Sequence, residues 1–341
     1  MTRQGRPGFA VATALFALVV VGALAIGTLF AATYEVRSGT DSMHQARAVM
    51  AAELGAEQTV ASWRREWNNA LGRGYGRSWG LVTPEGADVT VSLTRLADEL
   101  FVVTSEARAG PARRQVSRAV RLEVADPGLL AALVAAAPLD SSGAATIDGA
   151  DHAPEGWDCP TPGAPLPQVT VADTSAVLRF GQYDWSALGQ LATTSVALRV
   201  TGAAPRDGDE ECDTTHPLNW GEPVRSNGGA CTSYFPVIHA PGDLVVDGGR
   251  GQGVLIVDGD LTLTGGLEFY GAILVRGALR SGTGGAHVTG TVWVAAQTAT
   301  SSALDGLAID LSRCAARKAL VGLADPRPLT ERSWTQGFVE P

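Results

Sequence analysis

The 341-residue sequence predicts an α+β protein: a long N-terminal membrane-spanning helix packed on a small antiparallel sheet, followed by a short parallel β-helix (β-solenoid) head. Three observations predict this order: an uncharged apolar run at residues 9–32, alternating strands within 80–125, and apolar segments recurring from residue 235 onward. The expected units are a leader (1–8), a transmembrane and stalk helix (9–73), the sheet (80–125), the solenoid head (126–300), and a C-terminal capping helix with a tail (301–341).

The apolar run has the length and flanking charges of a membrane segment. Met1–Gly8 carries Arg3 and Arg6 and no acid, and the run at 9–32 carries no charge. At about 1.5 Å rise per residue, the run spans about 36 Å, whereas the hydrocarbon core of a bilayer is roughly 30 Å thick. The two arginines predict a cytoplasmic N-terminus and an exported C-terminal remainder.

Three interpretations of this segment compete. A secretory signal peptide would have an apolar core of only about 7–15 residues, and Phe30–Ala32 is a poor cleavage site. A plain signal anchor is physically sufficient. The third is a prepilin-type leader, in which cleavage after Gly8 makes Phe9 the new N-terminus; the string Arg-Pro-Gly-Phe at 6–9 fits it.

This string resembles the N-terminus of type IV pilin-like proteins, most closely the PilX-type minor pilin group, over about 25 residues. Major pilins carry Glu at the fifth mature position, which here is Thr13; PilX-type proteins and the K-type pseudopilin of type II secretion also lack that Glu. The resemblance implies a minor subunit acting in type IV pilus or pseudopilus assembly, adhesion or secretion. It also implies processing at Gly8–Phe9 by a prepilin peptidase.

The resemblance further implies a place and partners for the chain. The helix is expected to span the inner (cytoplasmic) membrane once, with the head exported to the periplasm or cell surface. The implied partners are the lipid bilayer, other pilin-like subunits and the inner-membrane assembly machinery.

Beyond the membrane, the helical pattern continues and then gives way to strands. Mostly apolar residues at helical spacing predict the stalk: Met43, Ala46, Val49 or Met50, Leu54, Val60 and Trp63. Gly72–Gly76 ends the pattern. The segments 89–93, 100–105 and 116–124 then alternate in polarity, and predict three or four antiparallel strands packed on the helix of residues 41–71.

Four apolar segments begin at a fixed interval, at Phe235, Val254, Ile273 and Val292. Their first and third positions are uniformly apolar and are expected inside. Their second and fourth positions include Pro236, Arg276 and Trp293 and are expected outside. A short fixed period with apolar columns in register is typical of a solenoid, here a parallel β-helix.

The solenoid needs caps, because its open ends would expose strand edges. The helical pattern 303–321 is one candidate cap, and residues 129–148 are a candidate earlier coil below Phe235. Residues 150–234 then form a long, Pro-rich loop insertion. The segment 326–334 is expected to be a tail laid on the solenoid, with Trp334 as its anchor.

Charge and cysteines limit the class of protein. The net charge of −9 is unevenly spread: residues 1–125 hold 14 arginines against 11 acids, and the acidic remainder argues against a nucleic-acid partner. Four cysteines beyond the membrane predict two disulfides, for which three connectivities exist. Cys212 and Cys231 flank one Gly- and Asn-rich loop and are the preferred pair, which leaves Cys159 with Cys314. No spacing supports a zinc site.

No residue pattern predicts catalysis or a cofactor. Asp243, Asp247, Asp258 and Asp260 are weak Ca²⁺ candidates and the candidate acids of a glycan-cleaving site. Each lies beside Gly at a corner, where Asp usually bonds nearby backbone. Glu268 and His287, one repeat interval apart, predict an exposed ion pair.

We therefore expect a protein that is not an enzyme. The alternatives are a membrane-anchored β-helix that binds envelope or extracellular polysaccharide without entering a filament, and an anchored polysaccharide-active enzyme.

Overall fold

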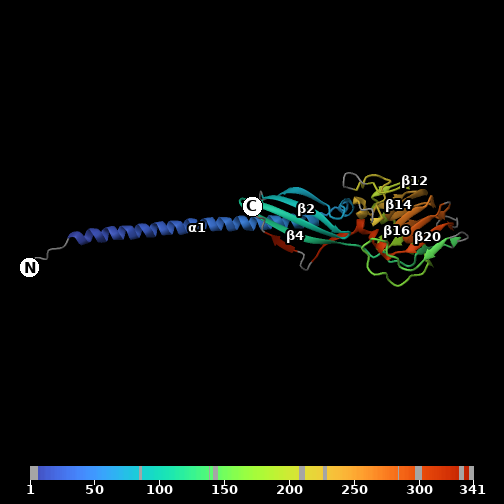
Figure 1. Ribbon diagram of the computed structural model, residues 1–341, viewed down its shortest axis with the longest axis horizontal. Coiled ribbons are helices and arrows are strands. Elements are labelled where there is room, and N and C mark those ends of the chain that lie inside the picture. Colours follow the sequence, from blue (N-terminus) through green and yellow to red (C-terminus); the bar gives the residue numbers. More distant parts are fainter. Residues whose placement is uncertain are drawn as a thin grey trace, which may run out of the picture.

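The structure is a computed structural model that describes residues 7–83, 87–137, 139–140, 145–206, 212–225, 229–282, 284–295, 302–329 and 334–337. A long N-terminal helix protrudes from one end, an antiparallel sheet lies at its base, and a mostly parallel β region lies beyond the sheet (Figure 1). The chain is thus α+β, as the sequence predicts.

The N-terminal helix is shorter than the predicted range 9–73. Helix α1 (Pro7–Ala61) ends at a turn, and a separate short helix α2 (Trp67–Ala70) follows. The turn lets the Trp63 indole donate a hydrogen bond to the Asn68 side-chain oxygen at 2.7 Å. It also stacks Trp63 edge-on against both Trp67 and Phe101. These contacts fix the base of the helix on the sheet.

The antiparallel sheet contains β1 (Gly76–Val82), β2 (Asp88–Ala97), β3 (Leu100–Ala109) and β4 (Ala112–Glu123), in that order. Two C-terminal strands, β21 (Asp325–Pro328) and β22 (Trp334–Gly337), both pair with β4. The expectation that this tail lies on the solenoid was therefore wrong. The tail covers the edge of β4, which would otherwise leave its backbone groups unpaired.

Small residues form the seam between α1 and the sheet. Ala48, Ala51, Ala52 and Ala56 are buried there. A Cβ on Gly55 would lie 2.5 Å from the Ser105 hydroxyl and 2.8 Å from a Val89 methyl, so the backbone of α1 approaches the sheet closely.

The predicted apolar stripe of the stalk packs against the core only at its C-terminal end, through Val60 and Trp63. Met43, Met50 and Leu54 are 47%, 54% and 46% exposed. Small residues, rather than these larger side chains, make the closest approach to the sheet.

The parallel β region is built from short strands whose pairing runs across large sequence distances. One ladder has the order β12, β14, β15, β17, β19, β6, and the other has β11, β13, β14, β16, β18, β5, β8, with β20 and β7 continuing from β18. The bounds of the strands are β5 (Leu133–Ala135), β6 (Leu139–Asp140), β7 (Thr146–Asp148), β8 (Val169–Val171), β11 (Thr194–Ser195), β12 (Leu198–Ala203), β13 (Val237–Ala240), β14 (Leu244–Val257), β15 (Leu261–Thr264), β16 (Leu267–Val275), β17 (Leu279–Ser281), β18 (Ala286–Val294), β19 (Ser302–Leu304) and β20 (Leu307–Leu311). A separate small hairpin pairs β9 (Arg179–Phe180) with β10 (Tyr183–Asp184).

The register follows the predicted repeat only in part. Ile273 pairs with Val292, as predicted. Val254 instead pairs with Val237 on one side and Ala272 on the other. The separations Val237 to Val254 and Val254 to Ala272 are therefore both shorter than the predicted interval. The length of a coil varies because the turns between strands differ in length. The stacked interior column is therefore Ile238, Leu255, Ile273 and Val292.

The opposite face of these strands is also buried. Trp293, expected outside, is only 3% exposed because Phe180 packs edge-on against its ring and helix α5 (Arg313–Lys318) packs on β16 and β18. Its neighbours Val254 and Ile256 belong to the same core, which continues under the antiparallel sheet. Arg276, by contrast, is exposed as predicted.

A column of glycines sets one corner of the parallel strands. Gly253, Gly271 and Gly290 are in register and have φ of +108°, +136° and +153°. A Cβ on Gly271 or Gly290 would collide with the carbonyl oxygen of the glycine one coil earlier. Only glycine permits both the conformation and the approach.

The segments that close the two ends of the parallel region differ in position or in structure from the predicted caps. Residues 129–148 do add strands, but these stack on β18, β19 and β20, at the opposite end from Phe235. The insertion 150–234 is more than loop, because β8, β11 and β12 join the ladders, and the short helices α3 (Thr174–Val177) and α4 (Trp185–Gln190) lie between them. The cap expected as a helix over 303–321 is strand β20 followed by the short α5.

Candidate functional site

The free part of α1 is the most exposed apolar surface in the described residues. From residue 11 to residue 47 almost every side chain is exposed, including Phe16 and Phe30 at 72% each, and the helix extends far from the rest of the molecule (Figure 1). No charged residue occurs before Glu35 in this stretch. It is the one helix among the described residues that is long and apolar enough to cross a membrane. A surface of this kind is stable only in lipid or against other apolar helices.

The predicted processing residues lie at the very start of this helix. Gly8 and Phe9 fall in the first turn of α1, and Pro7 occupies its first position, where proline is favoured. The leader residues 1–6 lie outside the described part of the chain. Cleavage between Gly8 and Phe9 would leave a helix that begins at its apolar end.

The four candidate aspartates do not converge on one site. Asp243 accepts a hydrogen bond from the Asp260 backbone N–H at 2.8 Å, and Asp260 accepts from the Ala278 N–H at 2.8 Å and pairs with Arg280 at 2.7 Å. Asp247 pairs with Arg199 at 3.5 Å. These carboxylates hold one coil to the next, so they bond backbone and side chains of neighbouring coils as well as their own turns. Nothing in this arrangement favours Ca²⁺ at them.

Asp258 has a different environment from the other three. It accepts from the Trp185 indole N–H at 2.6 Å and pairs with His239 at 2.9 Å. The three side chains line an open cavity of about 490 Å³ together with Gln190 and Arg276. The cavity combines one aromatic ring with several polar groups on the outer face of the parallel strands.

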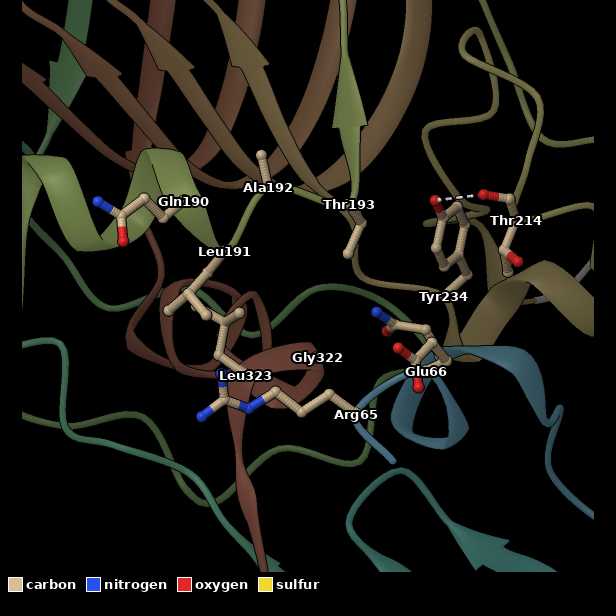
Figure 2. A pocket seen from close by; sticks show the side chains of 11 residues that line it. Arg65, Glu66, Gln190, Leu191, Ala192, Thr193, Thr214, Tyr234, Gly322 and Leu323 are labelled. Atoms are coloured by element: carbon tan, nitrogen blue, oxygen red, sulfur yellow. Dashed lines mark hydrogen bonds between the residues drawn. The ribbon is translucent and has the colours of Figure 1, made fainter. Parts of the chain in front are cut away.

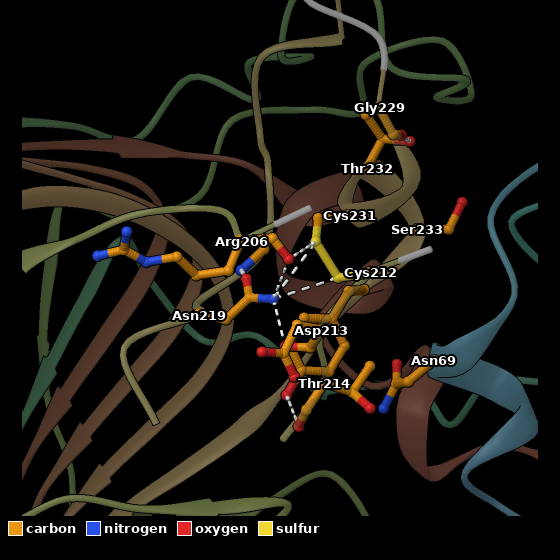
Figure 3. Close-up of a disulfide and its surroundings, with 12 residues drawn as sticks. Asn69, Arg206, Cys212, Asp213, Thr214, Asn219, Gly229, Cys231, Thr232 and Ser233 are labelled. Atoms are coloured by element: carbon orange, nitrogen blue, oxygen red, sulfur yellow. Dashed lines mark hydrogen bonds between the residues drawn. A yellow bond between two sulfur atoms is a disulfide. The ribbon is translucent and has the colours of Figure 1, made fainter. Parts of the chain in front are cut away.

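Both predicted disulfides are present: Cys159–Cys314 and Cys212–Cys231. Figure 3 shows the second, beside the buried Asn219. The Asn219 side-chain amide donates to the Asp213 carbonyl at 2.7 Å and contacts both sulfurs at 3.3 Å. The Cys159–Cys314 bridge ties the insertion to α5, and the Cys212–Cys231 bridge closes a loop within the insertion.

Arg95 forms the joint between the antiparallel sheet and the parallel region, and no sequence pattern indicated this role. Its guanidinium is fully buried and donates to the carbonyls of Asn68 (2.7 Å), Leu71 (2.8 Å) and Asp98 (2.5 Å), and to that of Ser233 at 3.3 Å. Burial lowers the pKa of Arg95 to about 10, which still leaves it charged at neutral pH. It thus satisfies carbonyls from both parts of the protein.

A buried ion pair lies beside this joint. Lys318 on α5 and Asp98, after β2, are 2.7 Å apart, and their side chains are only 6% and 7% exposed. Burial tends to raise the pKa of Asp98, but the charge and hydrogen bond of Lys318, with the nearby Arg225 and Arg95, lower that pKa below 3.8. Arg317 also forms a bidentate pair with Glu99. These contacts lock the sheet to the parallel region.

A second cavity, of about 380 Å³, lies at the same junction (Figure 2). Arg65 and Glu66 reach it from the turn before α2, Gln190 from α4, and Tyr234 from the opposite side. The Tyr234 hydroxyl donates to the Thr214 carbonyl at 3.4 Å, and burial raises its pKa. Among the described residues, no histidine or cysteine lines this cavity.

The predicted Glu268–His287 pair is in register but is not the ion pair that His287 makes. His287 instead bonds Asp310 at 2.8 Å, and a similar pair joins His152 to Asp148. The His287–Asp310 contact was not predicted, because these residues are 23 positions apart in the sequence, which exceeds the repeat interval.

Comparison with known proteins adds little. No protein-family model and no curated protein matches the chain. Among solved structures, the chain is similar to the competence-associated pilin ComZ from Thermus thermophilus, with 13% identity over 86% of this chain and 98% of that one. The TM-score of 0.26 is too low to establish a common fold. The functional interpretation therefore rests on the chain's own residues.

Proposed function

We propose that this chain is a minor pilin-like, membrane-anchored surface protein that acts in type IV pilus or pseudopilus assembly, adhesion or secretion. The proposal is carried by the division of α1 into two parts. Its uncharged first part is exposed, and its last part packs on an antiparallel sheet through Ala48, Ala51, Ala52 and Ala56. A helix divided in this way can anchor in lipid and present its head outside. It can also leave the lipid to pack among similar helices.

The N-terminal string supports the finer assignment. Gly8–Phe9 has the form of a prepilin cleavage site, and Thr13 stands where major pilins carry Glu. We place the chain in the PilX-type minor pilin group on this basis. The proposed partners are a prepilin peptidase, other pilin-like subunits, the inner-membrane assembly machinery and the lipid bilayer, with no nucleic acid. The head would lie in the periplasm or at the cell surface, joined to the inner membrane by a single span.

The bulk of the head supports a minor role. We infer that the parallel region winds as a short β-solenoid, because its two ladders stack successive chain passes over a common apolar interior from Val200 to Leu311. A head of this size would crowd a tightly repeating filament. The chain would then serve in few copies, at the base or tip.

Mass spectrometry of the mature N-terminus tests the proposal. The full chain is produced in a host with a prepilin peptidase and purified from membranes in detergent. We expect a chain that starts at Phe9, and expect Gly8→Leu to abolish the cleavage while Gly5→Leu preserves it. A wild-type chain that still starts at Met1, or that is cut after Ala31 or Ala32, would overturn the pilin assignment.

A second candidate function is the binding of envelope or extracellular polysaccharide without entry into a filament. The cavity lined by Trp185, His239, Asp258 and Arg276 favours it, because an aromatic ring beside polar side chains suits a sugar. Retention on polysaccharide beads, measured for wild type and Trp185→Ala, tests this candidate. Equal retention of the two would refute a role for the cavity.

We also propose that the protein is not an enzyme. The engagement of Asp243, Asp247 and Asp260 in bonds between coils supports this. Asp258 and His239 are the pair to test, because they are the acid and base that share a cavity. Glycan cleavage that is lost on Asp258→Ala would contradict the proposal.

A further inference from the structure

Two histidines and two aspartates meet on the outer face of the parallel ladder, away from both cavities. They come from three neighbouring strands and one turn: His287 on β18, Asp310 on β20, Asp148 on β7, and His152 just after β7. Asp310 and Asp148 are register partners on adjacent strands, and the His152 backbone N–H donates to the Leu311 carbonyl. The ladder thus fixes the backbone positions of all four residues.

The distances within this group are those of a potential coordination sphere. One ligand atom each from Asp148, His152 and Asp310 lie within 4.8 Å of one another. The fourth member, His287, places its Nε2 2.8 Å from Asp310 Oδ2, and His152 Nε2 lies 2.8 Å from Asp148 Oδ2. Two imidazole nitrogens and two carboxylate oxygens therefore gather on one patch, and the four side chains are between 37% and 49% exposed.

We propose that these four residues bind one divalent transition-metal ion, Zn²⁺ being the best fit. Zinc takes four ligands in a tetrahedron and accepts both imidazole nitrogen and carboxylate oxygen at about 2.0–2.2 Å. Ca²⁺ and Mg²⁺ prefer oxygen-only sets, so the two histidines select against them.

Local hydrogen bonds prepare the carboxylates for this role. Asp148 accepts from the Ala150 backbone N–H at 2.9 Å through Oδ1, which leaves Oδ2 for the shared centre. Each histidine now shares a hydrogen with a carboxylate. A metal ion would replace that hydrogen.

The ion would fasten one end of the parallel region. Asp148 and His152 belong to the segment that returns from residue 129 to close the ladder, whereas His287 and Asp310 belong to the coils that it closes. Their linkage through one ion would connect chain passes that lie far apart in the sequence. This proposal is independent of the proposed pilin function, because it uses no residue of α1 or the leader.

Isothermal titration of the tag-free full chain in detergent with Zn²⁺ alone tests the site. We expect one ion per chain with a Kd in the micromolar range or below, and at least about 10-fold weaker binding for His152→Ala and for His287→Ala. The matched control is His239→Ala, because His239 forms a similar pair with Asp258 but belongs to no comparable cluster among the described residues. This control should bind as wild type does.

A second measurement guards against misfolded variants. The exposed positions of the four side chains predict unchanged circular dichroism for both alanine variants. Co²⁺ added to wild type should give the intense visible absorption of a tetrahedral centre, and His287→Ala should lose it. Absence of Zn²⁺ binding by wild type at 100-fold excess, binding unaffected by both folded variants, or tight binding of Ca²⁺ in place of Zn²⁺ would each overturn the proposal.

Discussion

Replacement of Arg95 by methionine should weaken the contact between the antiparallel sheet and the parallel region and so lower the free energy of unfolding. Arg95→Met removes three short hydrogen bonds, to Asn68, Leu71 and Asp98, and leaves their buried carbonyls without the guanidinium. At about 2 kcal/mol for each buried group left unsatisfied, the loss is about 6 kcal/mol.

The buried charge offsets part of this loss. Burial lowers the Arg95 pKa to about 10, so the folded protein holds the charged form about 3 kcal/mol less favourably than water does. Methionine has a similar length and carries no charge, so this cost disappears in the variant. The net expectation is a decrease of about 3 kcal/mol in the free energy of unfolding.

Urea unfolding of the full chain in detergent, followed by tryptophan fluorescence, is the assay. Trp63, Trp67 and Trp79 pack together near the joint and report its loss. Arg95→Lys should fall between wild type and Arg95→Met, because an ammonium donates fewer hydrogen bonds than a guanidinium. Arg77→Met, at an exposed position on β1, is the matched control and should change the free energy by less than about 0.5 kcal/mol. A change below about 1 kcal/mol for Arg95→Met would refute the reasoning.

Three further predictions concern the same framework. The folded-state pKa of Asp98 is below its unfolded value of 3.8, so the stabilisation by the Asp98 carboxylate is present above about pH 4 and is lost as the pH falls through the folded pKa. The free energy of unfolding should therefore fall less steeply with decreasing pH for Asp98→Asn than for wild type. Parallel curves for the two proteins would contradict the lowered pKa of Asp98. Gly55→Val should lower the free energy of unfolding, measured by thermal unfolding, by about 1–3 kcal/mol, because the valine side chain would meet Ser105 and Val89. The control Gly39→Ala, which would have nothing within 4 Å of its Cβ, should be neutral or slightly stabilising. Equal effects of the two variants would refute the close approach of α1 to the sheet. Loss of the Cys159–Cys314 bridge, whose sequence separation is 155, should lower the free energy of unfolding by about 5 kcal/mol. Loss of the Cys212–Cys231 bridge, whose separation is 19, should lower it by about 3 kcal/mol. Unfolding of the two paired serine variants measures both changes, and the reverse order would count against the chain-entropy argument.

Local and compositional features of the fold were predictable from the sequence. The uncharged run at 9–32 can cross lipid only as a helix, whatever follows it. The alternating strands of 80–125 and the two disulfide pairs also follow from short-range pattern and from the position of Cys212 and Cys231 around one loop. Gly271 and Gly290 lie one repeat interval apart in the sequence, and both have a positive φ in the structure.

The candidate functional residues were predictable to a smaller extent. The predicted processing residues Gly8 and Phe9 form a local motif, which the sequence alone can reveal. The four aspartates were found as corner residues, but their partners were not, because Arg199, Arg280 and Trp185 come from other coils. Arg95 looked like any arginine in an alternating strand. Its burial is decided by the carbonyls of α2 and Ser233 that surround it.

The sequence by itself determined the long apolar N-terminal helix, the class of each region and the presence of stacked apolar segments, since these depend on the polarity and spacing of neighbouring residues. Only the tertiary structure decided which face of α1 meets the sheet, where residues 129–148 and the C-terminal strands attach, and that His152, Asp148, His287 and Asp310 converge. Periodicity predicts that one face of an element is buried. Which surface that face packs against depends on how closely the two backbones can approach. At Gly55 and along the glycine column, that distance is set by residues far apart in the chain.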